Sequence, residues 1–304
     1  IGELIGNNFD VTIRDLDNPA IAEDRMIEIT NEIMASNGFP NFFGIQRFGA
    51  VRPITHIVGR ELINGNFEKA VFTYIGNPMK NERKEAYDAR KFLEETHDFS
   101  KALELYPKEL YFERRIIAHL AKEPKDYANA LRRLPQNLTM MFIHAYQSYL
   151  FNKILSKRIE EGIQLNKAYI GDTILPIDKY GLPNQDEIIN VEKENIGKVN
   201  KKITEGKAFL SAPLFGSETK ISSGIGGEIE REVIEEEGVK NEDFIISSMP
   251  EVSSKGTRRE LVGIIRELDW KLVDGNLKIK FGIQRGAYAT SLLREYMKTG
   301  VLSY

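Results

Sequence analysis

The chain of 304 residues contains no cysteine, a single tryptophan and only four histidines. Without cysteine there can be no disulfide, thiolate metal ligand or cysteine nucleophile. No stretch approaches the roughly 18 consecutive apolar residues of a membrane helix, and the first residues lack the basic and apolar regions of a secretory signal. We therefore expect no membrane partner and a cytoplasmic location.

Metal chemistry and global charge attraction are also disfavoured. His56, His97, His119 and His144 are scattered along the chain without ligand spacing, so we expect no metal site. The formal net charge of −3 gives no overall attraction to nucleic acid, which means that any such binding must come from local patches. An apolar content of 41% over this length is enough to bury a core in each of two domains.

The two ends of the chain resemble α+β proteins. Phe9, Val11 and Ile13 alternate with polar residues and predict a half-buried strand, and the pair Asn18-Pro19 then predicts the start of a helix that ends near 37–38. Near the C-terminus, two alternating stretches on either side of 274–275 predict a β-hairpin with a primed turn. A final helix follows, with Thr290 or Ser291 as its candidate cap.

The middle of the chain is rich in helix-forming residues. Residues 79–135 are mostly helical in pattern, and 141–159 form a further amphipathic helix. We therefore predict an α+β fold in which a sheet domain is interrupted by an insertion, with residues 1–77 and 256–304 in the sheet domain and 78–255 in the insertion. The other face of the hairpin carries Lys271, Lys278 and Lys280, which suit either a solvated surface or a basic groove.

The segment 39–60, "FPNFFGIQRFGAVRPITHIVGR", follows the first predicted strand and helix and has no hydrophobic period. Its phenylalanines could plug a core beneath a loop, and Arg47 and Arg60 could pair with acidic surface residues. However, Asn41, Gln46 and the two arginines bring amide and guanidinium donors beside aromatic rings. Proteins use this combination to stack an unpaired base and read its edges.

The stretch "FPNFFGIQRFG", followed by "THIVGR", resembles the signature loop of the TruD family of tRNA pseudouridine synthases, whose pattern is Asn-aromatic-Phe-Gly-x-Gln-Arg-Phe-Gly. Three further stretches resemble the family in the same order, and together they cover essentially the whole chain: "GELIGNNF" at 2–9, "LPQNLTMMFIHAYQSYLFN" at 134–152 and "RGAYATSLLRE" at 285–295.

The resemblance implies a pseudouridine synthase fold, which is an antiparallel sheet flanked by helices, with a large α/β TRUD domain inserted into it. It also implies isomerisation of a uridine in the D-arm region of tRNA, at position 13 in the best-known members, without cofactor or metal. The implied partner is tRNA, whereas the oligomeric state is left open.

The resemblance also assigns roles to individual residues. Phe43 would stack on the flipped base, and Asn41 would help hold the loop and the catalytic carboxylate. The remaining residues are expected to contact RNA or shape its binding site: Gln46, Arg47, His56, Gly59, Arg60, Arg258, Arg259 and Arg285.

One element of the family pattern is absent. The catalytic Asp of the family lies in a Lys-Asp-x-x-Ala-x-Thr-x-Gln motif upstream of the Gly-Asn-x-Phe strand, and the present sequence begins at that strand. We therefore expect the nucleophile upstream of these 304 residues and expect this stretch alone to be inactive. The alternative is a catalytically inactive protein that binds or chaperones tRNA with the positively charged cleft that the resemblance implies between the two domains.

Overall fold

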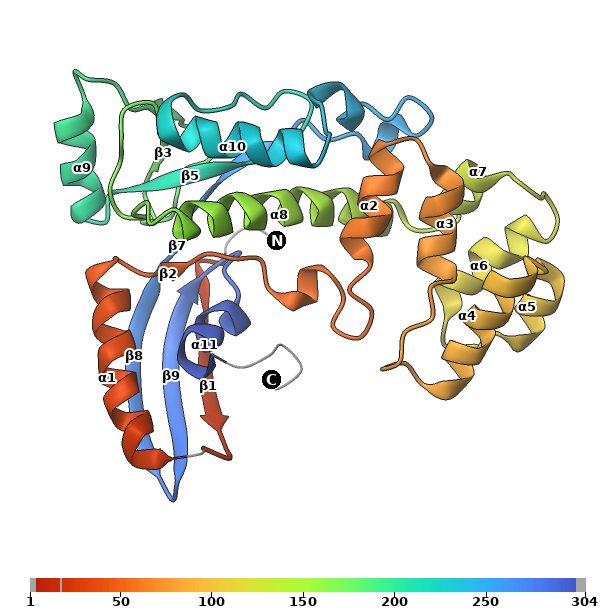
Figure 1. Cartoon of the computed structure of the whole chain (residues 1–304), viewed down its shortest axis with the longest axis horizontal. Helices are drawn as coiled ribbons and strands as arrows, with labels where there is room; N and C mark the ends of the chain where they lie inside the picture. The colour runs from red at the N-terminus through yellow and green to blue at the C-terminus, as the bar shows by residue number, and fades with distance from the viewer. Residues whose placement is uncertain (1–3, 17, 299–304) are drawn as a thin grey trace.

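A computed structural model of the chain describes residues 4–16 and 18–298 (Figure 1). One end of the molecule is a three-stranded antiparallel sheet in the order β1-β9-β8. The α-helices α1 and α11 pack against its apolar face, where they bury residues such as Met26, Ile279 and Leu292. The bounds of these elements are β1 Gly6–Ile13, β8 Ile265–Val273, β9 Asn276–Gln284, α1 Pro19–Ala35 and α11 Ala289–Met297.

The local sequence signals of this sheet unit are confirmed in all but one place. Alternation buries one face of β1, with Phe9 stacked on Phe281 at 5.3 Å between ring centroids. The hairpin turns at Asp274 and Gly275, both with positive φ as a primed turn requires. The predicted cap of the final helix is wrong, because α11 begins at Ala289 after Tyr288 and has no side-chain cap. Thr290 and Ser291 instead reach the loop that follows β2.

The other end of the molecule is helical and has a long central helix. α8 runs lengthwise through Figure 1, with α2 and α3 packed near one end of it and α4 to α7 beyond them. No helix in the described part of the chain combines the length and apolar character needed to cross a bilayer. The bounds are α2 Thr55–Ile63, α3 Phe67–Ile75, α4 Lys84–Thr96, α5 Phe99–Leu105, α6 Tyr111–Leu120, α7 Tyr127–Leu131 and α8 Gln136–Glu160.

A second antiparallel sheet in the order β4-β3-β5-β6 packs with α9 and α10 at the other end of α8. A short pair, β2 with β7, joins the two units. The bounds are β2 Phe39–Pro40, β3 Thr173–Pro176, β4 Ile189–Asn190, β5 Ala208–Leu214, β6 Thr257–Glu260, β7 Val262–Gly263, α9 Ile196–Thr204 and α10 Gly224–Glu236. Single 3-10 turns lie at Ile45–Arg47, Asn241–Phe244 and Pro250–Val252.

The packed cores do not follow the predicted domain boundaries at 77/78 and 255/256. α2 and α3, expected in the sheet domain, share a core with α8. β6, expected in the C-terminal part of the sheet domain, pairs with β5 of the second sheet. We therefore propose that the inserted unit begins near α2 and ends with β6, so that the loop after β2 enters it and β7 leaves it.

Candidate active site

The loop between β2 and α2 begins with a fully buried amide. Asn41 is 0% exposed, and its Nδ2 donates to Oε1 of Glu260 at 2.8 Å and to the Glu260 carbonyl oxygen at 3.2 Å. Arg259 Nη2 donates to Oδ1 of Asn41 at 2.8 Å. Since both ends of the amide are bound by β6, Asn41 fixes the loop against the second sheet.

Glu260 and Gln284 extend this arrangement and were missed at the level of sequence. Gln284, at the end of β9, also donates through Nε2 to Oε1 of Glu260, so one carboxylate oxygen receives two amide donors. Burial of Glu260 raises the pKa of its carboxyl above the usual value, against the smaller opposing effect of Arg259. One sequence feature could have indicated the burial of Glu260, because this acidic residue directly precedes the apolar residues Leu261 and Val262.

Arg259 is a buried cation, 7% exposed, and no ion pair of its guanidinium is found among the described residues. The charge of the nearby Glu260 only partly opposes the effect of burial on Arg259. Its described hydrogen-bond acceptors are oxygens of Asn41 and the Gly286 carbonyl oxygen, at 3.0 Å from Nη2. Burial lowers the pKa of Arg259. An unpaired buried charge is costly, and groups perturbed in this way concentrate at functional sites.

Phe43 lies beneath two guanidinium groups. The central carbon of Arg259 lies 4.0 Å from the centroid of its ring, and that of Arg47 lies 5.2 Å away. Phe151 and Tyr288 contact the ring edge-on, at 5.6 and 5.8 Å between centroids. At 6% exposure Phe43 belongs to a core, so a base could stack on it only after a neighbour such as Arg47 moves aside.

Side chains from distant parts of the chain hold the backbone of the same loop. Asn152 of α8 pairs with the backbone of Phe43, accepting from its N–H at 2.9 Å and donating to its carbonyl oxygen at 3.0 Å. From α11, Ser291 donates to the Phe42 carbonyl oxygen at 2.8 Å, and Thr290 donates to Gln46 Oε1 at 3.1 Å. Two elements more than 100 residues away in sequence thus position the loop.

A second group of predicted residues lies in the second half of the loop and in the helix α2 that follows it. The His56 ring lies between Phe48 and Tyr149, with centroids 5.2 and 5.0 Å away. Burial and the nearby Arg60 lower the pKa of His56, and burial and Arg47 lower that of His144. Within the described chain, Arg47 Nε and His56 Nδ1 are buried without a hydrogen-bond partner. The Arg60 side chain is exposed and pairs with Glu61 at 3.1 Å.

Gly59 and Arg258, which were predicted to belong to the RNA-binding site, contribute instead to packing in the protein interior. A Cβ on Gly59 would come within 2.1 Å of the Phe142 carbonyl oxygen, so this glycine allows α2 to approach α8 closely. Arg258 is buried and pairs with Glu230 of α10 at 2.6 Å, and its other donors bind oxygens of β5 and of the segment before α10. Neither residue is available to RNA in this arrangement, and we do not assign them to the site.

Arg285 lines a cavity of about 530 Å³ together with Arg259, Glu260 and Gln284. The opposite wall is the segment 178–186, which lies between β3 and β4. The cavity therefore lies between the inserted unit and the end of β9. It joins the buried Asn41 network to the surface, which makes it part of the candidate site.

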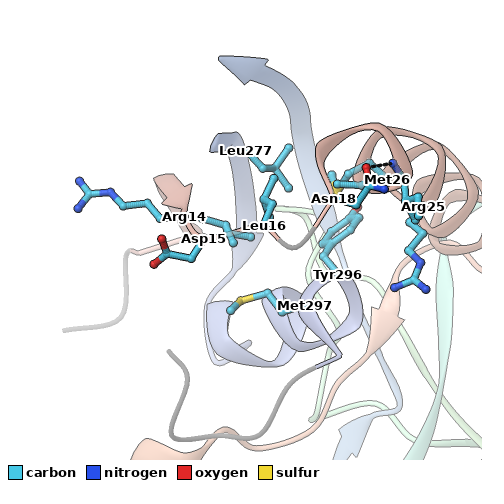
Figure 2. A pocket seen from close by; sticks show the side chains of 12 residues that line it. Arg14, Asp15, Leu16, Asn18, Arg25, Met26, Leu277, Tyr296 and Met297 are labelled. Atoms are coloured by element: carbon cyan, nitrogen blue, oxygen red, sulfur yellow. Dashed lines mark hydrogen bonds between the residues drawn. The ribbon is translucent and has the colours of Figure 1, made fainter. Parts of the chain in front are cut away.

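Another cavity, of about 330 Å³, lies where β1 meets α1 and α11. Figure 2 shows Leu16, Leu277 and Tyr296 gathered around it, with Arg14 and Arg25 extending away. None of the residues predicted for the site lines this cavity, and we do not place the active site there. Within residues 4–16 and 18–298, no three histidine, aspartate or glutamate side chains come together as a metal site would require.

Comparisons with known proteins identify relatives along nearly the whole chain. The family model described as "tRNA pseudouridine synthase D (TruD)" matches residues 1–296. A protein of Methanosarcina mazei named "Probable tRNA pseudouridine synthase D" is 45% identical over 99% of this chain and 70% of its own length. A protein of the same name from Thermococcus sibiricus is 39% identical over 98% of this chain and 70% of its own length.

The fold also matches a solved structure. The crystal structure of a TruD protein from Methanosarcina mazei superimposes with a TM-score of 0.94 at 44% identity, over 100% of this chain and 71% of that one. The α+β architecture and these matches place the chain among the pseudouridine synthases, a class of RNA-modifying isomerases. Within that class, the chain belongs to the TruD family.

Proposed function

We propose that the chain carries the RNA-binding and base-stacking part of an enzyme that converts a uridine in the D-arm region of tRNA, at position 13, to pseudouridine. In this reaction the bond from ribose C1′ to uracil N1 breaks, the base rotates, and C1′ bonds to C5. The proton lost from C5 is balanced by one gained at N1. The nucleophile is an Asp that we expect outside these 304 residues.

The observation that carries the proposal is the buried loop of a TruD-family chain, in which the Phe43 ring contacts the buried guanidinium of Arg259. Flipping a base out of its stack costs a few kcal/mol. Stacking on an aromatic ring returns about 1–3 kcal/mol per base, and a buried guanidinium adds attraction for an anionic group. Phe43 with Arg259 therefore has the chemistry to hold an extruded nucleotide.

Further RNA contacts are proposed for residues of the loop and of the first turns of α2. Arg47 Nε and His56 Nδ1 are buried donors or acceptors without a protein partner among the described residues, which suits groups that bind a ligand. Gln46 and Arg60 are exposed beside them, and Arg285 lies at the cavity. These groups would contact phosphate and sugar and so set the position of the RNA.

The test is a pseudouridine assay on unmodified tRNA. It compares the complete gene product with its Phe43→Ala variant, with an upstream Asp→Ala variant and with the 304-residue stretch alone. We expect conversion only by the complete protein, loss of conversion without the Asp, and strong reduction without Phe43. Salt-sensitive tRNA binding with no conversion by the complete protein would instead favour an inactive tRNA-binding protein.

A further inference from the structure

We propose that Asn152 is a positioning residue that fixes the ring of Phe43 for base stacking by pairing with the backbone of Phe43. The inference rests on the proposed function, since it explains how the stacking residue is held. Asn152 is described as a positioning residue rather than a catalytic one because both ends of its amide bind the backbone of Phe43.

The contact works in both directions. Oδ1 of Asn152 accepts from the Phe43 N–H at 2.9 Å, and Nδ2 donates to the Phe43 carbonyl oxygen at 3.0 Å. The side-chain amide thus makes the two hydrogen bonds that a residue of a neighbouring strand would make. It fixes the peptide groups on both sides of the Phe43 Cα. The direction of the side chain follows from the backbone, so the ring is fixed with it.

No other described residue supplies these two hydrogen bonds. The adjoining residues have partners of their own, since the Asn41 N–H donates to the Leu261 carbonyl oxygen and the Phe42 carbonyl oxygen accepts from Ser291. Removal of the Asn152 amide would leave the N–H and carbonyl of a buried residue unpaired, which the loop can relieve only by moving.

The helix that carries Asn152 is long and well packed. Asn152 projects from the 25-residue helix α8, and the preceding residue, Phe151, is fully buried and packs edge-on against Phe43. The helix therefore sets both the packing of the ring and the hydrogen bonding of its backbone. A displacement of about 1 Å at a reacting centre can cost on the order of 100-fold in rate.

A double-mutant cycle on the complete gene product tests the proposal. We expect N152A to lower kcat for tRNA conversion by about 10- to 100-fold while KM changes little. If Asn152 acts through Phe43, the N152A/F43A variant is no slower than F43A alone. Rate losses that multiply in the double variant would overturn the inference while leaving the proposed function standing.

A conservative variant adds a readout that a general loss of packing would not give. In N152D, the introduced carboxyl repels the Phe43 carbonyl oxygen when ionised, but it can donate to that oxygen when protonated. We therefore expect N152D to regain activity relative to the parent as the pH falls toward the pKa of the introduced group. An N152D to parent activity ratio that is independent of pH contradicts the proposal.

The positioning role can also be measured without activity. Amide hydrogen exchange at Phe43 should accelerate in N152A, and exchange in the core of α8 should stay unchanged. N241A is the matched control, because Asn241 also donates to backbone oxygens, those of Gly216 at 2.7 Å and Thr219 at 3.1 Å, away from the loop. Unchanged exchange at Phe43 in N152A overturns the inference even in a protein that converts no tRNA.

Discussion

Two buried polar clusters of this protein differ in whether their charged side chains contact one another directly. The helical cluster consists of Arg52, Glu82, Arg90 and Glu113, in which Glu82 bridges the two arginines at 3.4 and 2.8 Å and Arg90 also reaches Glu113 at 2.8 Å. The site cluster consists of Asn41, Arg259, Glu260 and Gln284, and amide groups rather than an ion pair connect it. Opposite charges form direct ion pairs in the helical cluster, whereas in the site cluster the Asn41 amide lies between the Arg259 guanidinium and the Glu260 carboxyl.

Arg52 in the helical cluster and Arg259 in the site cluster also differ in their surroundings. Arg52 donates to four carbonyl oxygens at the C-terminal end of α3, which binds the loop to the helical unit. Burial, together with Arg90, lowers the pKa of Arg52 to about 10, so it stays charged at neutral pH. In the site cluster, burial is the largest influence on the pKa of both Arg259 and Glu260, and the charge of each opposes that influence on the other without an ion-pair contact. Direct ion pairs offset the cost of burial in the helical cluster, whereas the two charges of the site cluster are separated by an amide and line a cavity, as is typical of a functional site.

Breaking the helical cluster at its centre should have the largest effect on stability. Arg90→Met keeps the apolar stem but leaves Glu113 buried without its cation and removes donors from the Tyr74 and Ile75 carbonyl oxygens. We expect the free energy of unfolding to fall by about 3–5 kcal/mol, measured by urea denaturation. A loss close to zero would mean that the cluster relaxes and that the contrast between the two clusters is only geometric.

The same kind of change in the site cluster should act on function more than on stability. In Arg259→Gln, we expect a loss of about 1–3 kcal/mol in unfolding free energy, because no carboxylate is left unpaired. Conversion of tRNA by the complete gene product should fall by about 100-fold or more, as for other lost electrostatic contacts. The comparison fails if this variant loses as much stability as Arg90→Met yet converts tRNA at the parent rate.

The pH dependence of stability sharpens the contrast at Glu260. Burial raises the pKa of Glu260 in the folded protein above its ordinary value of 4.5, so folding favours the protonated carboxyl. The parent should therefore lose stability as the pH rises from the unfolded pKa to the raised folded pKa. Glu260→Gln keeps the shape and abolishes the titration. Urea melts between pH 4 and 8 should therefore show the variant gaining stability relative to the parent as the pH rises, and a constant difference would argue against a raised pKa.

The smallest effect is expected at an exposed ion pair on the same helix as Arg90. Lys84 pairs with Asp88 one turn away on α4, and both side chains are largely exposed. In Lys84→Ala, we expect no measurable shift in the urea midpoint, because solvent screens such pairs. This variant is the control for Arg90→Met, and a large shift here would mean that α4 itself is unusually sensitive to substitution.

Much of the sheet unit could be predicted locally. Alternation set β1 and the β8–β9 hairpin, and the pair Asn18-Pro19 marked the start of α1, where Asn18 Oδ1 accepts from the Ile21 N–H at 3.4 Å. The cap of α11 was predicted incorrectly because Thr290 and Ser291 have the right chemistry for a cap, but the loop uses their hydroxyls instead. Local propensity does not record a competing tertiary partner.

The sequence by itself determined the family, the strand and helix periods and the loop that carries Phe43, since these depend on neighbouring residues and their order. Only the tertiary structure decided which polar residues meet. Arg258 and Arg259 are adjacent on a strand, so their side chains point to opposite faces, one toward Glu230 and the other toward Asn41. Which face meets the loop depends on the pairing of β6 with β5 and on the packing of α10, and no local pattern encodes such contacts between residues more than 200 positions apart.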